Sequence, residues 1–390
     1  MNTADSAALK TAAREAIDAD LPALVRLSHT IHNHPETAFE EDRACAWTSE
    51  ALAAGGFAVT PGVAGMPTAF SAQHGSGPMV VAVCAEYDAL PGVGHACGHN
   101  VIAASAVGAG LGLARVADQL GITVRVLGTP AEEGGGGKVT MLEHGLFDDV
   151  HAAMMIHPWP EDRLEGTCLA VSHFDVTFTG KSAHASAAPW EGVNAGDAMT
   201  IAQVAIGLLR QQLRPGDQVH GIVTGGGQAA NVIPETVTGR FMCRSRTLEG
   251  LALLEPRVTA CFDAGALATG SSVAFESLAP AYSHMECDPD LVALYRANAE
   301  SLGRTFTRDD ERAPRPTFST DMANVSLAVP TIHPLVGIDA AGSVNHQPEF
   351  AAACITPSAD TALRDGALSM AWTAIDAALP GALRDRLLAR

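Results

Sequence analysis

The segment 79–100, MVVAVCAEYDALPGVGHACGHN, constrains this chain more than any other part of its sequence. It opens with an unbroken apolar run, which predicts a strand that is buried on both faces. The run leads into the acidic residues Glu86 and Asp88, and a turn-rich loop then carries Cys97 and His99. A rigid strand followed by a loop rich in carboxylate, thiol and imidazole groups is typical of a metal site.

The overall composition excludes several classes of protein. The formal charge is -19 and no run of Lys or Arg occurs, which argues against binding to nucleic acid or to anionic membranes. Apolar residues make up 47% of the 390 residues and charged residues 17%, so a large core and an ordered chain are expected. No stretch of about 20 apolar residues is present, so we expect no membrane span. The eight cysteines are scattered without C-x-x-C spacing, and the N-terminus lacks the apolar segment of a signal peptide, which together predict reduced thiols and a cytoplasmic protein.

The order of the predicted elements indicates two domains. Strands and helices alternate up to about residue 171, which favours a doubly wound α/β sheet. The next part of the chain reads β-α-β-β-α-β, the order of a ferredoxin-like unit. The α/β pattern then resumes with a helix at 289–303, a strand at 328–333 and a helix at 357–378. We therefore predict a discontinuous α/β catalytic domain with a mixed sheet, formed by 1–171 and 283–390, and an inserted α+β domain at 172–282.

Three consecutive predicted strands end in residues of the kinds that bind metals. The strand at 79–86 leads to Asp88, Cys97 and His99, the strand at 122–127 leads to Glu132 and Glu133, and the strand at 152–156 ends at His157. In open α/β sheets ligands bind at the carboxyl ends of the strands, so these side chains are expected to converge. Each alone has an ordinary interpretation, such as a core cysteine or a solvated Glu-Glu loop, but their combination predicts a metal site.

The chemistry of this set suits a divalent ion. Thiolate, imidazole and carboxylate together favour zinc, with manganese or cobalt as alternatives. Neighbouring residues point in different directions, so one of Glu132 and Glu133 can bind metal while the other remains free as a base. A metal lowers the pKa of bound water to about 7, and a nearby carboxylate can then accept the proton.

The motifs together resemble a known family of enzymes. The segments IHNHPETAFEE, AEYDALPGVGHACGHN, PAEEGGGG, MMIHP, GKSAHAS, AANVIPE, STDMANVSLAVPTIHP and NHQPEF occur in the order seen in the co-catalytic metallopeptidases of peptidase family M-twenty, which includes aminoacylase, hippurate hydrolase and glutamate carboxypeptidase. The similarity covers nearly the whole chain. Within that family the sequence is most similar to the branch of dipeptidases acting on β-alanyl-lysine-like or Xaa-Arg substrates and of aminobenzoyl-glutamate hydrolase.

The resemblance implies roles for individual residues. The implied metal ligands, for one or two ions per subunit, are Cys97, His99, Glu133, His157 and His346. Glu132 is implied as general base and later as proton donor to the leaving amine, and Asp88 as the residue that orients a histidine ligand. The inserted domain is implied as a lid and as the site of homodimerisation.

The resemblance assigns three further residues to this lid. His184 would reach the active site of the partner subunit and stabilise the oxyanion, while Asn231 and Arg244 would hold a carboxylate of the substrate. Read without the resemblance, His184 is an exposed histidine and Arg244 a surface residue, with Arg246 as its rival. Asp321, in STDM, is predicted to line the substrate pocket, although it also fits a position beside a helix cap.

Some residues depart from the family pattern or lack a clear role. The wider family often has His-x-Asp where this chain has Glu86-x-Asp88, and related branches commonly read ACGHD where this chain has Asn100. His95 is interpreted as a loop anchor rather than as a further ligand. His32 and His34 are interpreted as packing residues near the site.

The sequence thus predicts a metal-dependent hydrolase that cleaves the amide bond of small N-acyl amino acids or dipeptides. Two other classes remain open. A thiol hydrolase would use Cys97 as its nucleophile, and a catalytically silent binding protein would keep the scaffold without the reaction. The intact pair of Glu132 and Glu133 argues against the silent protein, because such a protein does not need a free base.

Overall fold

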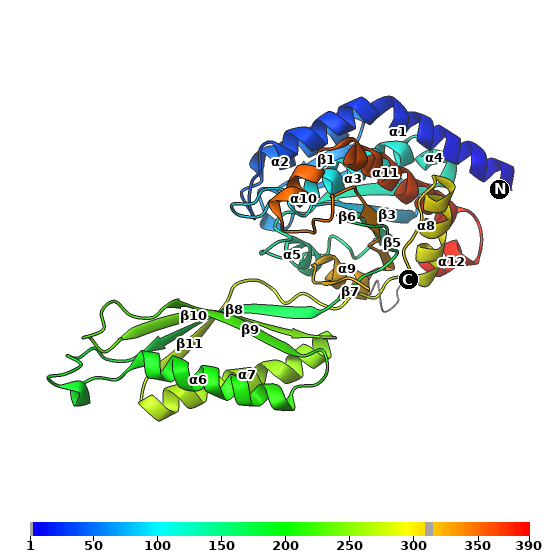
Figure 1. Cartoon of the computed structure of the whole chain (residues 1–390). Helices are drawn as coiled ribbons and strands as arrows, with labels where there is room; N and C mark the ends of the chain where they lie inside the picture. The colour runs from blue at the N-terminus through cyan, green and yellow to red at the C-terminus, as the bar shows by residue number, and fades with distance from the viewer. Residues whose placement is uncertain (1–2, 309–314) are drawn as a thin grey trace. The chain divides into compact units, whose positions relative to one another are not determined.

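The computed structural model describes residues 3–308 and 315–390. The chain divides into two compact units. Unit 1 comprises Met1–Thr167 and Met285–Arg390, and unit 2 comprises Cys168–His284. Each unit has its own hydrophobic core. The predicted fold class, an α/β catalytic domain with a mixed sheet and an inserted α+β domain, is confirmed (Figure 1).

Unit 1 is built around a six-stranded mixed sheet with the order β1-β2-β4-β3-β5-β13. Strands β3, β4, β5 and β13 run parallel, and β2 and β1 add an antiparallel edge. The strands of this sheet are β1 (Ala58–Pro61), β2 (Phe70–His74), β3 (Met79–Ala85), β4 (Ile122–Gly128), β5 (Ala152–Met154) and β13 (Thr331–Ile332). All seven residues of β3 are buried, as its continuous apolar sequence predicts.

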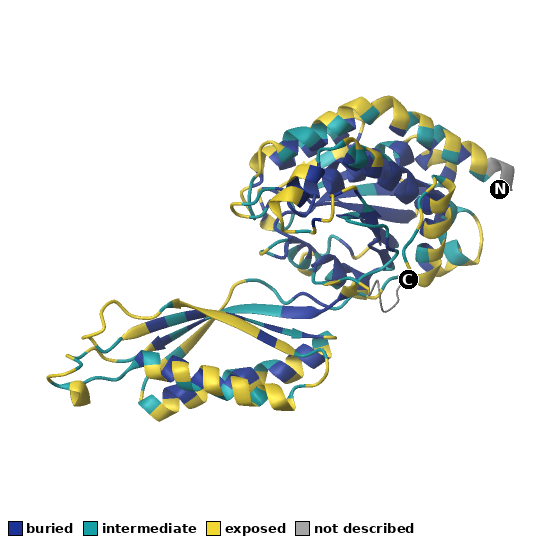
Figure 2. Ribbon diagram, in the orientation of Figure 1, coloured by how far each residue is buried: buried dark blue, intermediate teal, exposed yellow. Residues whose placement is uncertain are grey.

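Helices flank this sheet, and short elements connect to it. The helices of unit 1 are α1 (Thr3–His32), α2 (Asp42–Ala54), α3 (His99–Ala114), α4 (Ala117–Leu120), α5 (Gly137–Glu143), α8 (Pro289–Ser301), α9 (Met322–Ala328), α10 (Pro348–Ala353), α11 (Pro357–Ala378) and α12 (Ala382–Leu388). The short elements are η1 (Val63–Gly65), β6 (His157–Trp159), β7 (Thr167–Cys168), β12 (Thr317–Phe318) and β14 (Leu335–Gly337). In Figure 2 the central strands and α3 are buried, while the outer face of α1 is exposed.

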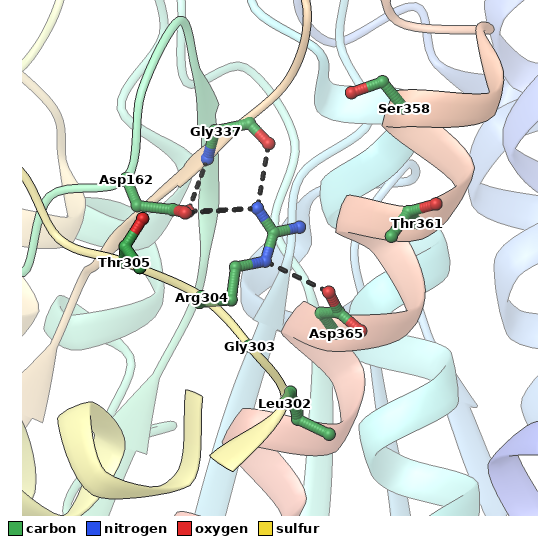
Figure 3. Close-up of a pocket in the computed structure, with 9 residues that line it drawn as sticks. All are labelled: Asp162, Leu302, Gly303, Arg304, Thr305, Gly337, Ser358, Thr361 and Asp365. Atoms are coloured by element: carbon green, nitrogen blue, oxygen red, sulfur yellow. Dashed lines mark hydrogen bonds and ion pairs between the residues drawn. The ribbon is translucent and has the colours of Figure 1, made fainter. Parts of the chain in front are cut away.

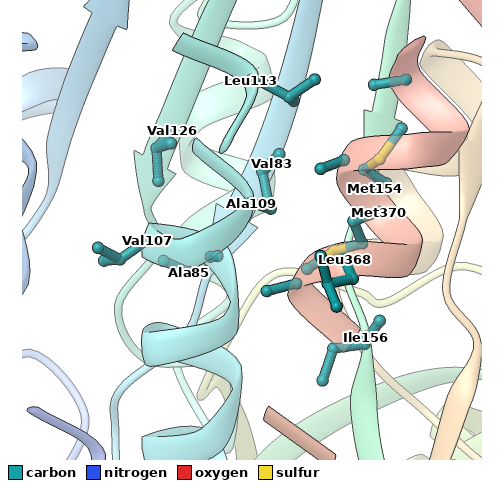
Figure 4. Close-up of a cluster of buried hydrophobic side chains, with 14 of the residues drawn as sticks. Val83, Ala85, Val107, Ala109, Leu113, Val126, Met154, Ile156, Leu368 and Met370 are labelled. Carbon is teal, nitrogen blue, oxygen red and sulfur yellow. The ribbon is translucent and has the colours of Figure 1, made fainter. Parts of the chain in front are cut away.

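Small residues allow α3 to pack closely between the sheet and α11. A Cβ atom on Gly110 would lie 2.7 Å from Val126 Cγ2 on β4, and one on Gly108 would lie 3.0 Å from Ala367 Cβ on α11. Figure 4 shows the apolar side chains that fill this layer, from the strands, α3 and α11. Because α3 begins at His99, its packing also fixes the position of that histidine.

Two predicted elements differ from the structure. The Ala-rich segment from Val101 to Leu120, whose composition favours a single helix, is interrupted after Ala114, where Val116 leaves helical geometry, and it continues as the short α4. The strand expected at 328–333 is limited to β13, because α9 extends to Ala328 and Pro330 has no N–H group to offer a sheet.

Unit 2 is a four-stranded antiparallel sheet with the order β11-β8-β10-β9, and two long helices cover one of its faces (Figure 1). Its elements are β8 (Ala170–Thr179), η2 (Pro189–Glu191), α6 (Ala195–Leu209), η3 (Arg210–Gln212), β9 (Gln218–Gly225), β10 (Thr236–Ser245), α7 (Leu248–Thr269) and β11 (Ser272–Ser277). The helices α6 and α7 pack on each other and on β8 and β10. Strand β9 forms one edge of this sheet.

Among the described residues, no helix combines the length and the apolarity needed to cross a membrane. Seven of the eight cysteines are buried, and Cys287 is half-buried. The location of the protein stays a prediction.

Candidate metal centre

The carboxyl ends of three parallel strands meet at one edge of the sheet of unit 1. Glu86 follows β3, the loop with Glu132 and Glu133 follows β4, and His157 lies just beyond β5. The parallel register places these strand ends side by side, as the sequence predicts. Thr129 adds a direct link, because its N–H donates to the carbonyl oxygen of Ala85 at 2.8 Å.

The structure brings together side chains that are far apart in the sequence. Three groups of potential ligand atoms occur among the described residues, and within each group the atoms lie within 4.8 Å of one another. The groups are Cys97 with His99 and His157, Cys97 with Glu133 and His346, and Glu86 with His99 and Glu132. Cys97 and His346 are thus neighbours although 248 positions lie between them in the sequence. These groups contain all five residues that the resemblance implies as ligands, together with Glu86 and Glu132.

Hydrogen bonds orient two of the histidines. His99 Nδ1 lies 3.0 Å from Asp88 Oδ1, and because an ionised carboxylate only accepts, His99 donates from Nδ1. His157 Nδ1 donates in the same way to the carbonyl oxygen of Pro158 at 2.8 Å. When neutral, each ring therefore has the lone pair on Nε2, where a metal that displaces the proton can bind.

Asp88 also contacts the loop that carries the two glutamates. Its second oxygen, Oδ2, accepts from the backbone N–H of Glu133 at 3.0 Å. Asp88 is buried, so both of its contacts are held within the fold. One carboxylate thereby links the strand end at β3, the start of α3 and the loop after β4.

Buried polar atoms without partners converge on the centre. His99 Nε2, Glu86 Oε2 and Glu133 Oε1 are buried and have no hydrogen-bond partner among the described residues. His99 Nε2 lies 3.4 Å from Glu86 Oε2 and 3.9 Å from Glu133 Oε1. An unsatisfied buried polar group costs about 1–3 kcal/mol, so such a cluster calls for a ligand that attracts all of these atoms. Sulfur, nitrogen and oxygen donors in this arrangement fit a divalent metal ion.

The electrostatics of the protein groups favour a positive charge here. Burial, followed by the charges of Glu86 and Glu133, raises the pKa of Glu132 well above its ordinary value. Burial also raises the pKa of Glu133. Burial opposes a charge on His99, but Asp88 and Glu86 outweigh it and raise the pKa of His99 well above normal. The carboxylates at this edge therefore create the negative environment that complements a cation.

A buried lysine beside this cluster was missed by the sequence analysis. Lys138 at the start of α5 is completely buried, and its Nζ lies 2.5 Å from Glu86 Oε1 and 2.6 Å from Asp321 Oδ1. Burial lowers the pKa of Lys138, but Asp321 and Glu86 outweigh this effect and raise it. The signal that we overlooked is a lysine directly after GGGG, at the end of the loop that carries both glutamates.

Asp321 is the second acidic partner of Lys138 in this buried ion pair. Its Oδ2 also accepts from the backbone N–H of Lys138 at 2.9 Å, and its side chain is fully buried. Its predicted contact with substrate stays a prediction, whereas its contact with Lys138 is observed.

The other residues with an uncertain role have different surroundings. Asn100 is buried and donates from Nδ2 to Ser28 Oγ at 2.8 Å and to the carbonyl oxygen of Cys354 at 3.0 Å, so it joins helices rather than orienting a ligand. His95 is buried, and the centroid of its ring lies 6.1 Å from that of the His32 ring. Neither belongs to the three ligand groups.

The residues assigned to the lid lie in unit 2, at two ends of its sheet. His184 and Asn231 are exposed, and their loops are joined by a bridge between His184 and Val232. Arg244 lies near the end of β10, opposite Val171, whereas Thr236 at the start of β10 follows the Asn231 loop. Eight residue steps along the strand separate Thr236 from Arg244, which corresponds to roughly 26 Å. The Asn231 loop and Arg244 thus lie toward opposite ends of β10, and their joint binding of one carboxylate stays a prediction.

A pocket of about 380 Å³ elsewhere in unit 1 has a different character (Figure 3). Arg304 at its centre donates to Asp162 at 3.1 Å, to Asp365 at 3.1 Å and to the carbonyl oxygen of Gly337 at 3.0 Å. These contacts join α11 to the segments around β14 and Asp162. The charges there satisfy one another, so we interpret this pocket as a structural junction.

Comparisons with known proteins agree with this centre. Residues 82–364 match the family described as Peptidase family M20/M25/M40. The chain is 38% identical over 392 residues to the Xaa-Arg dipeptidase of Mus musculus, which covers 96% of this chain and 90% of that protein. It is 33% identical over 280 residues to a p-aminobenzoyl-glutamate hydrolase component of Escherichia coli (strain K12), which covers 66% of this chain and 58% of that protein.

Solved structures show the same fold. An aminobenzoyl-glutamate utilization protein from Klebsiella pneumoniae matches with a TM-score of 0.74 at 19% identity, covering 94% of this chain and 99% of that one. A dinuclear metal-binding peptidase from Bacillus subtilis matches with a TM-score of 0.68 at 22% identity, covering 92% and 98%. The resemblance seen in the sequence motifs is confirmed: the chain belongs to peptidase family M20/M25/M40 and is a metal-dependent hydrolase of that family.

Proposed function

We propose that this enzyme hydrolyses the amide bond of small dipeptides and N-acyl amino acids that carry a free carboxylate. The observation that carries the proposal is the position of Glu132, a buried carboxylate next to a convergent set of metal-type ligands. The similarity to a Xaa-Arg dipeptidase supports a dipeptide with a basic C-terminal residue as the first substrate to test. The acidic composition agrees with such a substrate.

The residues that would hold the metal are Cys97, His99, Glu133, His157 and His346. Their sulfur, nitrogen and oxygen donors fit zinc first, with manganese and cobalt as alternatives, for one or two ions. When bound, a divalent ion polarises the scissile carbonyl and lowers the pKa of a water molecule. Burial lowers the pKa of His157 to about 4, so its imidazole is neutral and able to act as a ligand at pH 7.

Glu132 would move the proton in this reaction. As a carboxylate it accepts a proton from the attacking water, and as a carboxylic acid it donates that proton to the nitrogen of the leaving amine. Its raised pKa favours uptake of the proton from the attacking water, because burial makes the protonated carboxyl group the more stable form. Asp88 would keep His99 in the correct tautomer and hold the backbone beside Glu132.

We assign substrate recognition to unit 2, with residues contributed by unit 2 of both subunits of a homodimer. Arg244 and the His184–Asn231 loops lie at opposite ends of one sheet, so a homodimer is the simplest way to bring both to one substrate. Arg244 would bind the substrate carboxylate through its planar guanidinium, and His184 would stabilise the oxyanion. The dimer would form through unit 2, where β9 is an edge strand and the apolar side chains of Val204, Leu208 and Ile222 are exposed.

An activity screen tests the reaction. The purified enzyme is assayed on alanyl-arginine, β-alanyl-lysine, N-acetyl amino acids and p-aminobenzoyl-glutamate, with metal analysis of the same sample. We expect turnover that EDTA abolishes and that zinc or manganese restores. Turnover that survives EDTA but is lost with iodoacetamide would instead support a thiol hydrolase. The raised pKa of Cys97, caused by burial and then by the charge of Glu133, makes that alternative unfavourable.

Mixing two inactive variants tests the shared site. Glu132→Gln removes the base and His184→Ala removes the residue that would act on the partner. Random exchange of subunits makes half of the molecules mixed dimers, each with one intact site, so about a quarter of the parent activity should return. No recovery in a sample shown to contain mixed dimers would place His184 in the site of its own subunit.

A further inference from the structure

We propose that Glu41 is a positioning residue that aims Glu132 and Glu133 at the centre by holding the backbone N–H of Ala131. The proposal rests on the function proposed above for these two glutamates. Nothing in the sequence motif around Glu41 assigns it this role, because the segment IHNHPETAFEE contains no residue of the three ligand groups.

The residue directly before Glu132 has an unusual backbone conformation. Ala131 has a φ of 59°, in the left-handed region that residues with a Cβ atom rarely adopt. Its carbonyl oxygen accepts from the N–H groups of Gly135 and Gly136, both at 2.8 Å. A conformation that is unfavourable for alanine persists only when surrounding contacts hold it in place.

Glu41 supplies the contact at the other end of Ala131. Its Oε1 accepts from the N–H of Ala131 at 2.9 Å, across 90 positions of sequence, and its side chain has 0% exposure. Two residues further on, the backbone N–H of Glu133 donates to Asp88 Oδ2 at 3.0 Å. Two carboxylates from different segments thus fix the backbone on both sides of Glu132. Because the direction of a side chain follows from its backbone, these contacts determine where both glutamates point.

The local structure explains why Glu41 is free for this task. Glu41 immediately precedes α2, where an acidic residue commonly caps the helix, yet it makes no such bond. Glu36 caps α2 instead, because its carboxylate accepts from the N–H groups of Arg43 and Ala44 at 3.0 Å each. The carboxylate of Glu41 can therefore turn inward to Ala131.

The same short segment also touches the loop after β3. The carbonyl oxygen of Glu36 accepts from the N–H of Ala89, next to Asp88, at 2.8 Å. Residues 36–41 therefore contact both loops that supply the centre, one through a main-chain group and the other through a buried carboxylate. This arrangement gives the motif a specific task that packing alone does not explain.

The test compares Glu41→Ala with Glu41→Gln and with Glu40→Ala as the matched control. Glu40 is the exposed neighbour of Glu41, and its carboxylate accepts from the Thr37 hydroxyl at 3.4 Å, whereas the amide oxygen of a glutamine at position 41 can still accept the N–H of Ala131. We measure amide hydrogen exchange in peptides covering residues 129–136, together with zinc content and with kcat and KM on alanyl-arginine. For Glu41→Ala we expect about tenfold faster exchange of this loop and about tenfold lower kcat with little change in KM. The Gln and Glu40→Ala variants should stay close to the parent.

A second substitution distinguishes positioning from general stability. Glycine adopts left-handed backbone freely, so adding Ala131→Gly to Glu41→Ala should recover about threefold of the lost kcat. Because kcat is measured at a temperature where every variant is folded, a purely global loss of stability would leave kcat unchanged and give the glycine nothing to recover. If Glu41→Ala fails to fold, Glu41→Asp, which keeps the charge but is one methylene shorter, takes its place with the same expected exchange and kcat.

The outcomes separate the two proposals. Unchanged exchange in residues 129–136 for Glu41→Ala, or a Glu41→Gln variant as impaired as Glu41→Ala, would overturn the role of Glu41. A parent enzyme that turns over none of the amides in the screen would overturn the proposed function, while the exchange measurement would still decide on Glu41.

Discussion

Unit 1 buries the Lys138 ammonium completely between Glu86 and Asp321, whereas unit 2 leaves the ion pair of Asp175 and Arg240 largely at the surface, with 29% and 53% of the two side chains exposed. The same contrast holds for the candidate functional groups. In unit 1, Cys97, His99 and Glu132 are buried, although the side chain of His346 is 60% exposed, while His184 and Asn231 lie on exposed loops of unit 2.

This difference in burial indicates how each unit can contribute to function. Burial removes water as an alternative partner, so the fold defines the arrangement of the buried groups of unit 1 before any ligand arrives. Surface groups remain solvated, and they acquire a defined arrangement only when another molecule contacts them. The centre in unit 1 is thus preorganised, whereas the exposed groups of unit 2 stay adaptable, as the recognition role that we propose for them requires.

The largest effect is expected where a buried group does chemistry. Glu132→Gln removes a proton acceptor but keeps the shape of the side chain, so kcat should fall by about 10²- to 10⁴-fold. Metal content, measured by elemental analysis of the same sample, should stay at the parent level because Glu132 is not a proposed ligand. Unchanged turnover would remove Glu132 from the mechanism.

Breaking the buried ion pair should affect the whole fold of unit 1. Lys138→Met leaves two buried carboxylates without their cation, which should lower the free energy of unfolding by about 3–5 kcal/mol. Denaturant titration followed by circular dichroism measures this change. A loss below about 1 kcal/mol would mean that Glu86 and Asp321 find other partners, and the contrast between the units would weaken.

The pH dependence of stability tests the burial of Glu41. Burial, and then the charge of Asp88, raises the pKa of Glu41 from 4.5 to about 7. The folded state therefore holds this proton more tightly than the unfolded state, and the associated stability, complete below pH 4.5, is lost as the pH rises to about 7. The slope is about 1.4 kcal/mol per pH unit, or about 3 kcal/mol over this window.

Glu41→Gln should remove this dependence. Measured by denaturant unfolding in EDTA, the stability of the variant relative to the parent should increase by about 3 kcal/mol between about pH 4.5 and pH 7. Parallel curves for the two proteins would show that Glu41 titrates normally and is more solvated than its position indicates.

The smallest effect is expected for the exposed pair of unit 2. Arg240→Ala breaks the bidentate contact of 2.8 and 2.9 Å with Asp175 but should lower the free energy of unfolding by less than about 1 kcal/mol, because both groups return to water. The same titration measures it beside Lys138→Met. A loss as large as that of Lys138→Met would contradict the distinction between the units.

Local patterns made much of this structure predictable. The apolar run of β3, the alternation of strands and helices and the change of pattern near Val171 follow from short-range periodicity, which depends on neighbouring residues only. The boundaries of α3 and β13 were less accurate, because a bend at Val116 and the missing N–H of Pro330 act within one or two residues.

The sequence by itself determined the kinds of element, their order and the chemical character of the residues at the strand ends, because periodicity and motif order are properties of the chain. Only the tertiary structure decided which charges meet. The pairing of Lys138 with Asp321 spans 183 positions, and that of Glu41 with the N–H of Ala131 spans 90. The separation of Asn231 from Arg244 follows from the register of β10. Such contacts form when elements pack, and no local pattern encodes the partner of a buried charge.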